Sequence, residues 1–448
     1  MKKKKTIITI ICILVSFICF IKVQKIFTVG HDRSFQAEEG FYHERKDSLD
    51  AVYIGASSVH AFWEPPIAWK KWGIAVRSYS IDALPSKSLP FLITEIDKTQ
   101  PNALLIISLN TFKSINVNDV QIHRSTNYLR FSLNKMNAIH SLANDAGYKG
   151  FDQIQFYFPI IRFHSRWSEL NSWDFNHTDN GLKNGLVYTP YLQNVSDVTA
   201  NYYFVTEEQD LPQARAAFLE EFLNFLDESG HDVLFVSSPM AAGNNMRTYR
   251  LLNRMGTIIK DHGYPYLNLI NAIDEMEIQT ETDFYNNYHT NVHGALKFTD
   301  YLAQYLVDNY EFSDKRGQPG WESWDEAIDL YTDMIGPYTL SFEREHAPRD
   351  YDLAAPILNK VKVKDQTLTI SWKESPNAEG YDIYRKSAAS GEQNWIYLTS
   401  TESDTLQYID SGLKSGKKYT YTVVPKKYAG GVEVYGNFDF TGVTGTTK

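Results

Sequence analysis

After the N-terminal segment, short apolar runs alternate with amphipathic stretches along the chain. The runs 51–58 and 103–110 are predicted as strands, and the stretch 88–100 between them has the mixed pattern of a half-buried helix. The alternation returns at 214–228, where apolar residues recur at helical spacing. It continues with a strand at 231–239, a helix at 249–262 and a strand at 264–269. Strands that alternate with helices are typical of β-α-β units, so the pattern predicts an α/β domain on a parallel sheet.

A long stretch without clear periodicity interrupts this alternation. Residues 115–205 are rich in aromatic residues, Asn and His, and include FYFPIIRFHSRWSEL at 156–170. We predict that this stretch is an insertion that covers the carboxyl ends of the strands, where open α/β sheets bind their substrates. The α/β domain as a whole is then expected to span residues 50–312.

The chain changes character after residue 312. The polar and charged region 313–354 is predicted to be a linker that carries a helix, and 355–448 contains short alternating runs typical of strands. The pattern predicts an all-β sandwich for this last segment. With Trp372 in an early strand, the segment resembles a fibronectin type III domain, an immunoglobulin-like sandwich. The resemblance implies that the Tyr419 hydroxyl bonds a corner back to the backbone.

The N-terminus combines a basic cluster with an apolar run. Four lysines precede Thr6, and an apolar stretch then continues to Ile21. This pattern predicts a transmembrane helix within residues 1–27, entered from a basic cytoplasmic side, with the rest of the chain outside the cell. A cleaved signal sequence is the competing interpretation, but no small-x-small cleavage site follows Phe20. Residues 28–49 are polar and are expected to form a stalk.

Composition narrows the function classes. The chain has 448 residues, 43% of them hydrophobic, and a net charge of -10 without a basic stripe, which argues against a nucleic-acid partner. Both cysteines, Cys12 and Cys19, lie in the apolar N-terminal run. The remaining residues therefore have no thiol for a disulfide or a zinc cage, and no metal or other cofactor is expected.

Ser57 is the first candidate for chemistry. It follows a predicted strand that ends at Gly55, and a helical stretch begins directly after it. A serine at such a turn lies at the carboxyl edge of the sheet, and the neighbouring backbone N–H groups at the helix N-terminus can bind an oxyanion. The position makes Ser57 a candidate nucleophile, although small residues at such turns often serve only the turn itself.

His289 is the candidate base for this serine. It precedes the predicted last helix of the α/β domain, so it can reach the same edge of the sheet as Ser57. The residue three positions before it is Asn286, whose amide can accept the imidazole N–H but carries no charge, and could also select the wrong tautomer. Asp283 could supply the acid instead, a Ser–His dyad could suffice, or activity could be lost.

The order of these residues resembles the SGNH/GDSL hydrolases, in the form found in exported proteins of Gram-positive bacteria. The matching segments are GASSVHAFWEPPIAWKKWGIAVRSYS, FHSRWSEL and HTNVHGALKFTDYL, within residues 45–310. The resemblance implies a three-layer, flavodoxin-like α/β fold. It also implies an oxyanion hole made by the backbone N–H groups of Ser57 and Ala83 and the side chain of Asn110. Ala83 stands where the family has a glycine.

Several further side chains are candidates for binding. His60 lies just after the serine turn, and His164 and Arg166 lie in the insertion, where an arginine could bind anionic or hydroxylated ligands. Packing and structural ion pairs explain such residues equally well. His293 lies four residues after His289, but no zincin-type acid accompanies the pair, so we predict a capping or packing role for it.

Two functions remain from the sequence. The first is an extracytoplasmic serine esterase or O-acyltransferase, in which Ser57 and His289 form an acyl-enzyme on an acylated glycan or cell-wall polymer. A membrane-bound O-acyltransferase is then an expected partner, and the location is the cell membrane with the bulk of the chain at the cell surface. The alternative is a degenerate SGNH-fold surface protein that binds glycan or protein.

Overall fold

The computed structural model describes most of the chain, in two compact units. Its described residues are 2–27, 40–113, 115–127, 129–175, 186–187, 205–241, 246–345, 347–387, 395–437, 439 and 441–448. The first unit ends at Tyr331 and the second begins at Thr332. Parts of the predicted stalk and of the predicted insertion lie outside the described residues.

The first unit is built on a five-stranded parallel sheet, which confirms the α/β prediction. Its strands follow the order β2-β1-β3-β4-β5. They are β1 (Ala51–Gly55), β2 (Val76–Ser80), β3 (Leu104–Ser108), β4 (Val233–Ser237) and β5 (Tyr266–Asn268). The order 2-1-3-4-5 is that of flavodoxin-like sheets, in which strands are added first on one side of β1 and then on the other, so that the strand order switches between β1 and β3. Ligands of such sheets bind outside the carboxyl ends of the strands, at the point where the strand order switches.

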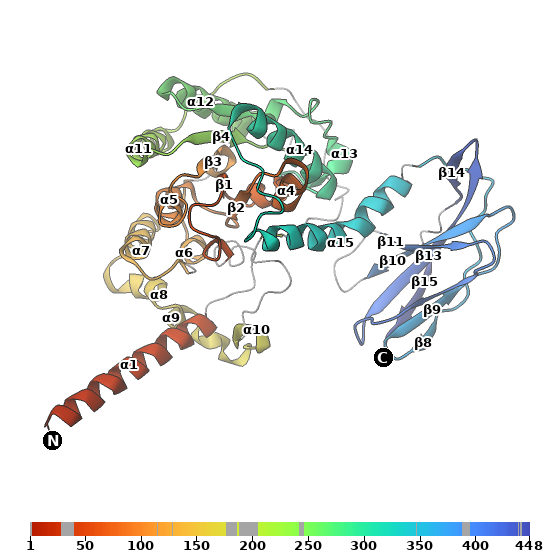
Figure 1. The fold of residues 1–448 in the computed structure, drawn as a ribbon, viewed down its shortest axis with the longest axis horizontal. Coiled ribbons are helices and arrows are strands. Elements are labelled where there is room, and N and C mark those ends of the chain that lie inside the picture. Colours follow the sequence, from red (N-terminus) through yellow and green to blue (C-terminus); the bar gives the residue numbers. More distant parts are fainter. Residues whose placement is uncertain are drawn as a thin grey trace. The chain divides into compact units, whose positions relative to one another are not determined.

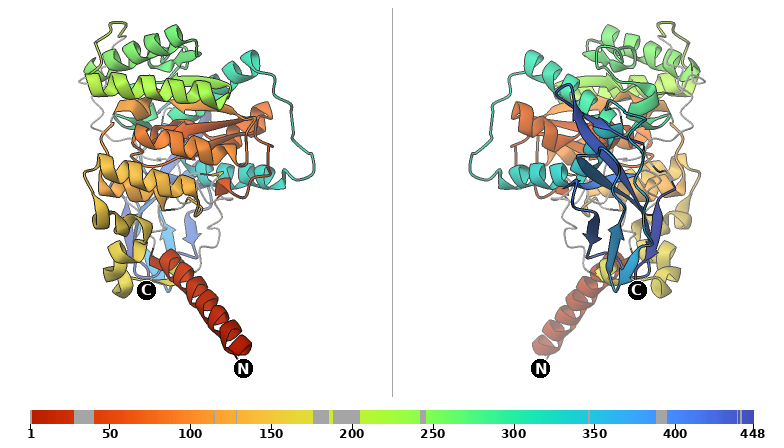
Figure 2. Two further views of the ribbon diagram at one scale, coloured as in Figure 1. Left: turned by 90° about the vertical axis from the view of Figure 1, so that its left-hand side faces the viewer. Right: turned by 90° about the vertical axis from the view of Figure 1, so that its right-hand side faces the viewer.

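Helices cover both faces of the sheet (Figure 1). The helices up to β5 are α3 (Ser58–Phe62), α4 (Pro65–Trp72), α5 (Leu89–Asp97), α11 (Gln213–Ser229) and α12 (Met246–His262). After β5 follow α13 (Thr280–Asp283), α14 (Val292–Asn309) and α15 (Glu322–Glu345). On one face, Tyr53 and Ile106 of the sheet share a buried core with Phe62 of α3 and Phe298 of α14. Helices α11 and α12 lie side by side in both views of Figure 2.

The predicted insertion is more helical than its pattern suggested. Its described part forms α6 (Asp119–Thr126), α7 (Leu133–Asp145), α8 (Ile154–Tyr157), α9 (Pro159–Phe163) and α10 (Ser172–Phe175). A small separate core holds part of it together, with Ile122, Ile139, Leu142 and Phe156 buried. Short helices with so few buried residues leave little periodicity in a sequence, which explains why they were not predicted.

The N-terminal run forms the helix α1 (Lys2–Phe27). Within the described part of the chain, no helix meets the combined length and hydropathy that a membrane crossing requires. The predicted transmembrane helix is therefore not confirmed.

The second unit confirms the predicted sandwich, because two antiparallel sheets make up its β-structure. One sheet has the order β11-β10-β13-β14, with β15 also pairing with β13, and the other has the order β12-β9-β8. The strands are β8 (Lys362–Lys364), β9 (Thr367–Ser371), β10 (Gly380–Ser387), β11 (Ile396–Glu402), β12 (Gln407–Asp410), β13 (Lys418–Ala429), β14 (Val432–Tyr435) and β15 (Val443–Thr446). Trp372 lies in the buried core, and the Tyr419 hydroxyl accepts the backbone N–H of Lys414 at 3.2 Å, as expected.

Candidate active site

The turn that carries Ser57 is fixed by the end of strand β3. A Cβ added to Gly55 would lie 2.7 Å from Ser108 Cβ and 2.8 Å from Thr111 Oγ1, so only glycine fits between the strands. The next backbone N–H, of Ala56, donates to Thr111 Oγ1 at 3.0 Å. These contacts hold Ser57 at the carboxyl edge of the sheet, beside the point between β1 and β3 where the strand order switches.

His289 reaches this edge from a short hairpin. Strands β6 (Phe284–Asn286) and β7 (His289–Thr290) pair antiparallel directly before α14. The Thr290 hydroxyl donates to the carbonyl of Ala61 in α3, which ties the hairpin to the serine turn. As a result, Ser57 Oγ lies 2.8 Å from His289 Nε2, and both residues are half-buried.

The amide of Asn286 orients the imidazole. Its Oδ1 accepts the backbone N–H groups of Tyr288 at 2.9 Å and His289 at 3.1 Å, and lies 3.0 Å from His289 Nδ1. Because two N–H donors converge on one amide atom, that atom must be the oxygen. His289 Nδ1 must then carry the proton, and Nε2 is left to accept the proton of Ser57. Asn286 thus selects the productive tautomer, although it supplies no negative charge.

Asp283 does not reach the histidine. Its buried carboxylate accepts the Gln279 N–H at 2.9 Å and bonds Lys297 Nζ at 2.7 Å, both through Oδ2. Its Oδ1 accepts the Thr282 hydroxyl at 3.1 Å. The carboxylate therefore anchors the segment before the hairpin, and the structure does not support Asp283 as the acid beside His289.

Two of the expected oxyanion donors, the backbone of Ala83 and the side chain of Asn110, have a conformation or hydrogen bonds that the structure defines. Ala83 has φ of 56°, the left-handed conformation in which glycine is favoured, so its backbone keeps a glycine-like geometry despite its side chain. Asn110 is buried, and its amide accepts the Ser238 N–H at 2.9 Å and donates to the Ser238 carbonyl at 3.0 Å. The Asn110 amide has a second N–H, which neither of these two bonds uses.

His60 belongs to the scaffold of the site rather than to its wall. It is 2% exposed, and its Nδ1 lies 2.8 Å from Ser80 Oγ, which itself donates to the Ala56 carbonyl at 3.0 Å. Its Nε2 lies 3.7 Å from Asp82 Oδ1, next to Ala83. His60 therefore joins the turn after β1 to the turn after β2.

The other predicted binding residues lie elsewhere in the unit. His164 Nδ1 lies 2.9 Å from the Ile161 carbonyl in its own helical segment. Arg166 bonds the Phe27 carbonyl at 3.0 Å and the buried carboxylate of Asp174 at 2.7 Å, which gives it a structural ion pair. No interaction in the described part of the chain joins either residue to Ser57 or His289.

His293 belongs to the start of helix α14. Its backbone N–H donates to the N-cap residue Asn291 at 3.0 Å. Among the described residues, no group of three or more His, Cys, Asp or Glu side chains could hold a metal ion.

Lys113 is a residue that sequence reasoning missed. It ends the 3₁₀ helix η2 (Leu109–Lys113) that follows β3, and its ammonium lies 4.7 Å from the ring centre of Tyr288, the residue before His289. Burial lowers the pKa of its ammonium to about 8. Its place three residues after Asn110 was a usable signal, because ligands of such sheets bind outside the carboxyl ends of the strands.

Comparisons with known proteins gave matches among solved structures only. No protein-family model and no curated protein matches the chain. Similar solved structures include a β-1,2-glucanase from Parabacteroides distasonis, with 24% identity over 23% of this chain and 14% of the glucanase, and a TM-score of 0.19. They also include a Fn3-like protein from Clostridium thermocellum, 27% identical over 19% of this chain and 88% of its own, with a TM-score of 0.16. The fn3 domain of human contactin 1 is 19% identical over 23% of this chain and 83% of its own, with a TM-score of 0.19. The chain is thus similar, over about a fifth of its length, to fibronectin type III domains.

Proposed function

We propose that this chain is an SGNH-type serine esterase or O-acyltransferase that acts on an acylated cell-envelope or exported polysaccharide. The observation that carries the proposal is the relay Ser57–His289–Asn286, in which the serine, the imidazole and an oriented amide oxygen follow one another at 2.8 and 3.0 Å. A Ser–His pair of this geometry activates the hydroxyl for attack on an ester.

The proposed reaction proceeds through an acyl-enzyme. Ser57 Oγ attacks the ester carbonyl while His289 Nε2 accepts its proton, and the resulting oxyanion meets the N–H donors of Ser57, Ala83 and Asn110. The intermediate collapses, the ester C–O bond breaks, and His289 returns the proton to the leaving alcohol. Water or a sugar hydroxyl then attacks the acyl-enzyme with His289 as base, which gives hydrolysis or transfer respectively.

We further propose that the protein works outside the cytoplasm, held at the cell membrane by its N-terminal segment. The basic cluster before Thr6 and the apolar run to Ile21 support this location. In the transferase form of the proposal, a membrane-bound O-acyltransferase supplies the acyl group. The fibronectin-like unit then serves as a spacer or as a binding module for the polymer.

The decisive test is labelling of the purified chain with a fluorophosphonate, together with turnover of p-nitrophenyl acetate and of an acetylated glycan. We expect the wild-type protein to be labelled at Ser57 and to hydrolyse both esters, whereas Ser57→Ala and His289→Ala lose both signals. Ser58→Ala is the matched control, because Ser58 is buried and its Oγ faces Ser108 Oγ at 3.3 Å.

The competing binding function makes the opposite prediction. A surface protein with a degenerate site would show no labelling above the Ser57→Ala background and no turnover above the His289→Ala variant. It would still bind glycan through either unit. That result would remove the esterase proposal.

A further inference from the structure

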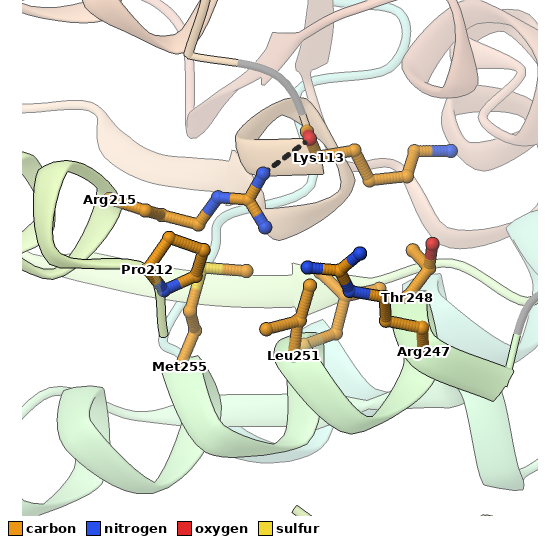
Figure 3. Close-up of a pocket in the computed structure, with 8 residues that line it drawn as sticks. Lys113, Pro212, Arg215, Arg247, Thr248, Leu251 and Met255 are labelled. Atoms are coloured by element: carbon orange, nitrogen blue, oxygen red, sulfur yellow. Dashed lines mark hydrogen bonds between the residues drawn. The ribbon is translucent and has the colours of Figure 1, made fainter. Parts of the chain in front are cut away.

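A cavity of about 270 Å³ lies between helices α11 and α12 and the end of η2 (Figure 3). Its polar lining consists of Lys113, Arg215, Arg247 and Thr248. Its remaining lining residues are Pro212, Leu251, Leu252 and Met255. Two arginines and one lysine thus line the cavity together with apolar side chains.

The charges in this cavity are not balanced by the residues that line it. No carboxylate is among the described residues of the lining, although the chain as a whole has a net charge of -10. Two guanidinium groups face the same space from two different helices, Arg215 from α11 and Arg247 from α12 (Figure 3). Gathering like charges in one place costs free energy unless an anion compensates them.

Part of this arrangement also serves the fold. Arg215 Nη2 donates to the carbonyl of Lys113 at 2.9 Å and so holds the end of η2. The Nε atom of Arg215, however, is buried and meets no hydrogen-bond partner within the described part of the chain. An unsatisfied buried donor on a cation indicates that a further acceptor belongs there.

The cavity connects to the catalytic pair through Lys113. The Lys113 ammonium lies over the Tyr288 ring, and Tyr288 immediately precedes His289. Lys113 also lies three residues beyond the oxyanion candidate Asn110, on the same 3₁₀ helix. A polymer that extends from Ser57 past Lys113 would bring a neighbouring negative group to the arginines of this cavity.

We propose that this cavity binds an anionic group, a phosphate or a carboxylate, on the polymer whose acyl ester reacts at Ser57. Arginine guanidinium groups match both anions with paired N–H donors. The proposal rests on the proposed esterase or acyltransferase function, and it narrows the substrate from any acylated glycan to an acidic one.

Direct anion binding tests the site without requiring turnover. The full chain is titrated calorimetrically with inorganic phosphate, and separately with glucuronate, at constant ionic strength. We expect at least one of the two anions to bind, and Arg247→Gln to weaken that binding roughly tenfold, the effect of one lost charge-assisted hydrogen bond. Arg247→Lys should restore part of the affinity, and the anion that binds more tightly identifies the acidic group.

The matched control is Arg254→Gln on the same helix α12. Arg254 pairs with Glu208 at 3.4 Å and does not line the cavity, so its removal should leave anion binding unchanged. Equal affinities in Arg247→Gln and Arg254→Gln, or no binding of either anion to the wild-type chain, would overturn the proposal.

A kinetic arm links the cavity to the reaction. We expect kcat/KM to be higher for the acetyl ester of a sugar phosphate or uronate than for that of the neutral sugar, and Arg247→Gln to reduce this preference roughly tenfold.

Ser57→Ala should abolish turnover and still bind the anion. If Ser57 proves unreactive while anion binding depends on Arg247, the esterase proposal fails and the anion site stands. If Ser57 reacts and no anion binds, the anion site fails and the esterase proposal stands.

Discussion

At the scale of single residues, the amide of Asn286 decides how well His289 can act. The oriented oxygen gives the productive tautomer but no charge to stabilise the imidazolium that forms during attack. We predict that Asn286→Asp raises kcat about tenfold, because the two backbone N–H groups that now bind the amide oxygen also suit a carboxylate. Asn286→Ala should lower kcat about a hundredfold. Steady-state kinetics with p-nitrophenyl acetate measure both.

The control for this pair is the unfolding midpoint of each variant, which must stay close to that of the wild-type chain. If Asn286→Asp and Asn286→Ala had equal kcat, position 286 would not orient the imidazole at all.

The lowered pKa of Lys113 predicts a pH dependence of anion binding. Its ammonium faces the Tyr288 ring and the Met240 sulfur, and it shares the cavity with Arg215 and Arg247. Because burial lowers its pKa to about 8, the cavity loses one positive charge as the pH rises through that value, while the arginines stay charged. Sulfate, which does not titrate in this range, should bind more weakly at pH 9.5 than at pH 6.5.

Lys113→Gln isolates this effect. The variant should bind sulfate with an affinity that hardly changes between the two pH values, as measured by calorimetry. A pH dependence that survives in Lys113→Gln would assign the titration to another group.

The sequence predicted which residues lie at this site better than it predicted the role of each residue. Ser57 and His289 were predictable as a pair because each adjoins a strand end or a last helix, and such places converge at one edge of a parallel sheet. The orientation of Asn286 was not predictable, because it depends on two backbone N–H groups of a two-residue turn. The sequence alone did not show whether Arg166 binds a ligand or forms a structural ion pair, because the position of Asp174 beside it is known only from the structure.

At the scale of elements, a buried histidine makes helix α6 sensitive to acid. His123 is 5% exposed and packs against the rings of Phe156 and Phe163, and burial lowers its pKa to about 4. Between that value and about 6.5 the unfolded chain binds more protons than the folded chain, so stability falls as the pH falls through this window. The protection factors of the amides in α6 and α7, which correct for the pH dependence of intrinsic exchange, should therefore fall between pH 6.5 and pH 4.

His123→Gln tests the origin of this loss. It removes the titrating group, so its protection factors should be lower than those of the wild-type chain at pH 7 but nearly independent of pH. An equally strong acid effect in His123→Gln would point to other groups on α6.

The turn after β2 predicts a stabilising substitution. Ala83 adopts φ of 56°, where a side chain costs about 1 kcal/mol that glycine avoids. Ala83→Gly should therefore raise the free energy of unfolding slightly, because the relieved strain exceeds the added entropy of the unfolded chain, and it should keep the proposed esterase activity. Urea denaturation and p-nitrophenyl acetate turnover check the two parts. Loss of activity at unchanged stability would show that the side chain itself matters at this position.

The regular elements were the most predictable part of the fold. The predicted helix 249–262 is α12, which begins three residues earlier, and the predicted strand 264–269 contains β5. Amphipathic helices and buried strands repeat a pattern over many residues, whereas the hairpin β6–β7 has five residues of strand in total and no pattern of its own. The placement of His289 on that hairpin therefore required the structure.

At the scale of the whole molecule, the two units have separate cores. In the second unit, Trp372, Tyr381, Ile383 and Tyr421 are buried together, and its Asp382 is buried beside Arg344 and Lys426. We predict that a fragment spanning 332–448 folds without the first unit and unfolds in one cooperative transition by calorimetry. A broad, non-cooperative transition of this fragment would contradict the prediction, and Trp372→Ala should abolish cooperative unfolding as a positive control.

The distance along the chain between Ser57 and His289 has a consequence for how the protein matures. The two residues are 232 positions apart, and the hairpin that holds His289 is fixed against α3 only when nearly the whole first unit is in place. Contacts of such long range form late, because the entropy of closing the loop must be overcome first. In a partly synthesised chain, Ser57 therefore lacks His289 as its partner. Under the proposed esterase function, reactivity begins only with the completed unit, so that a chain still being exported would not yet react.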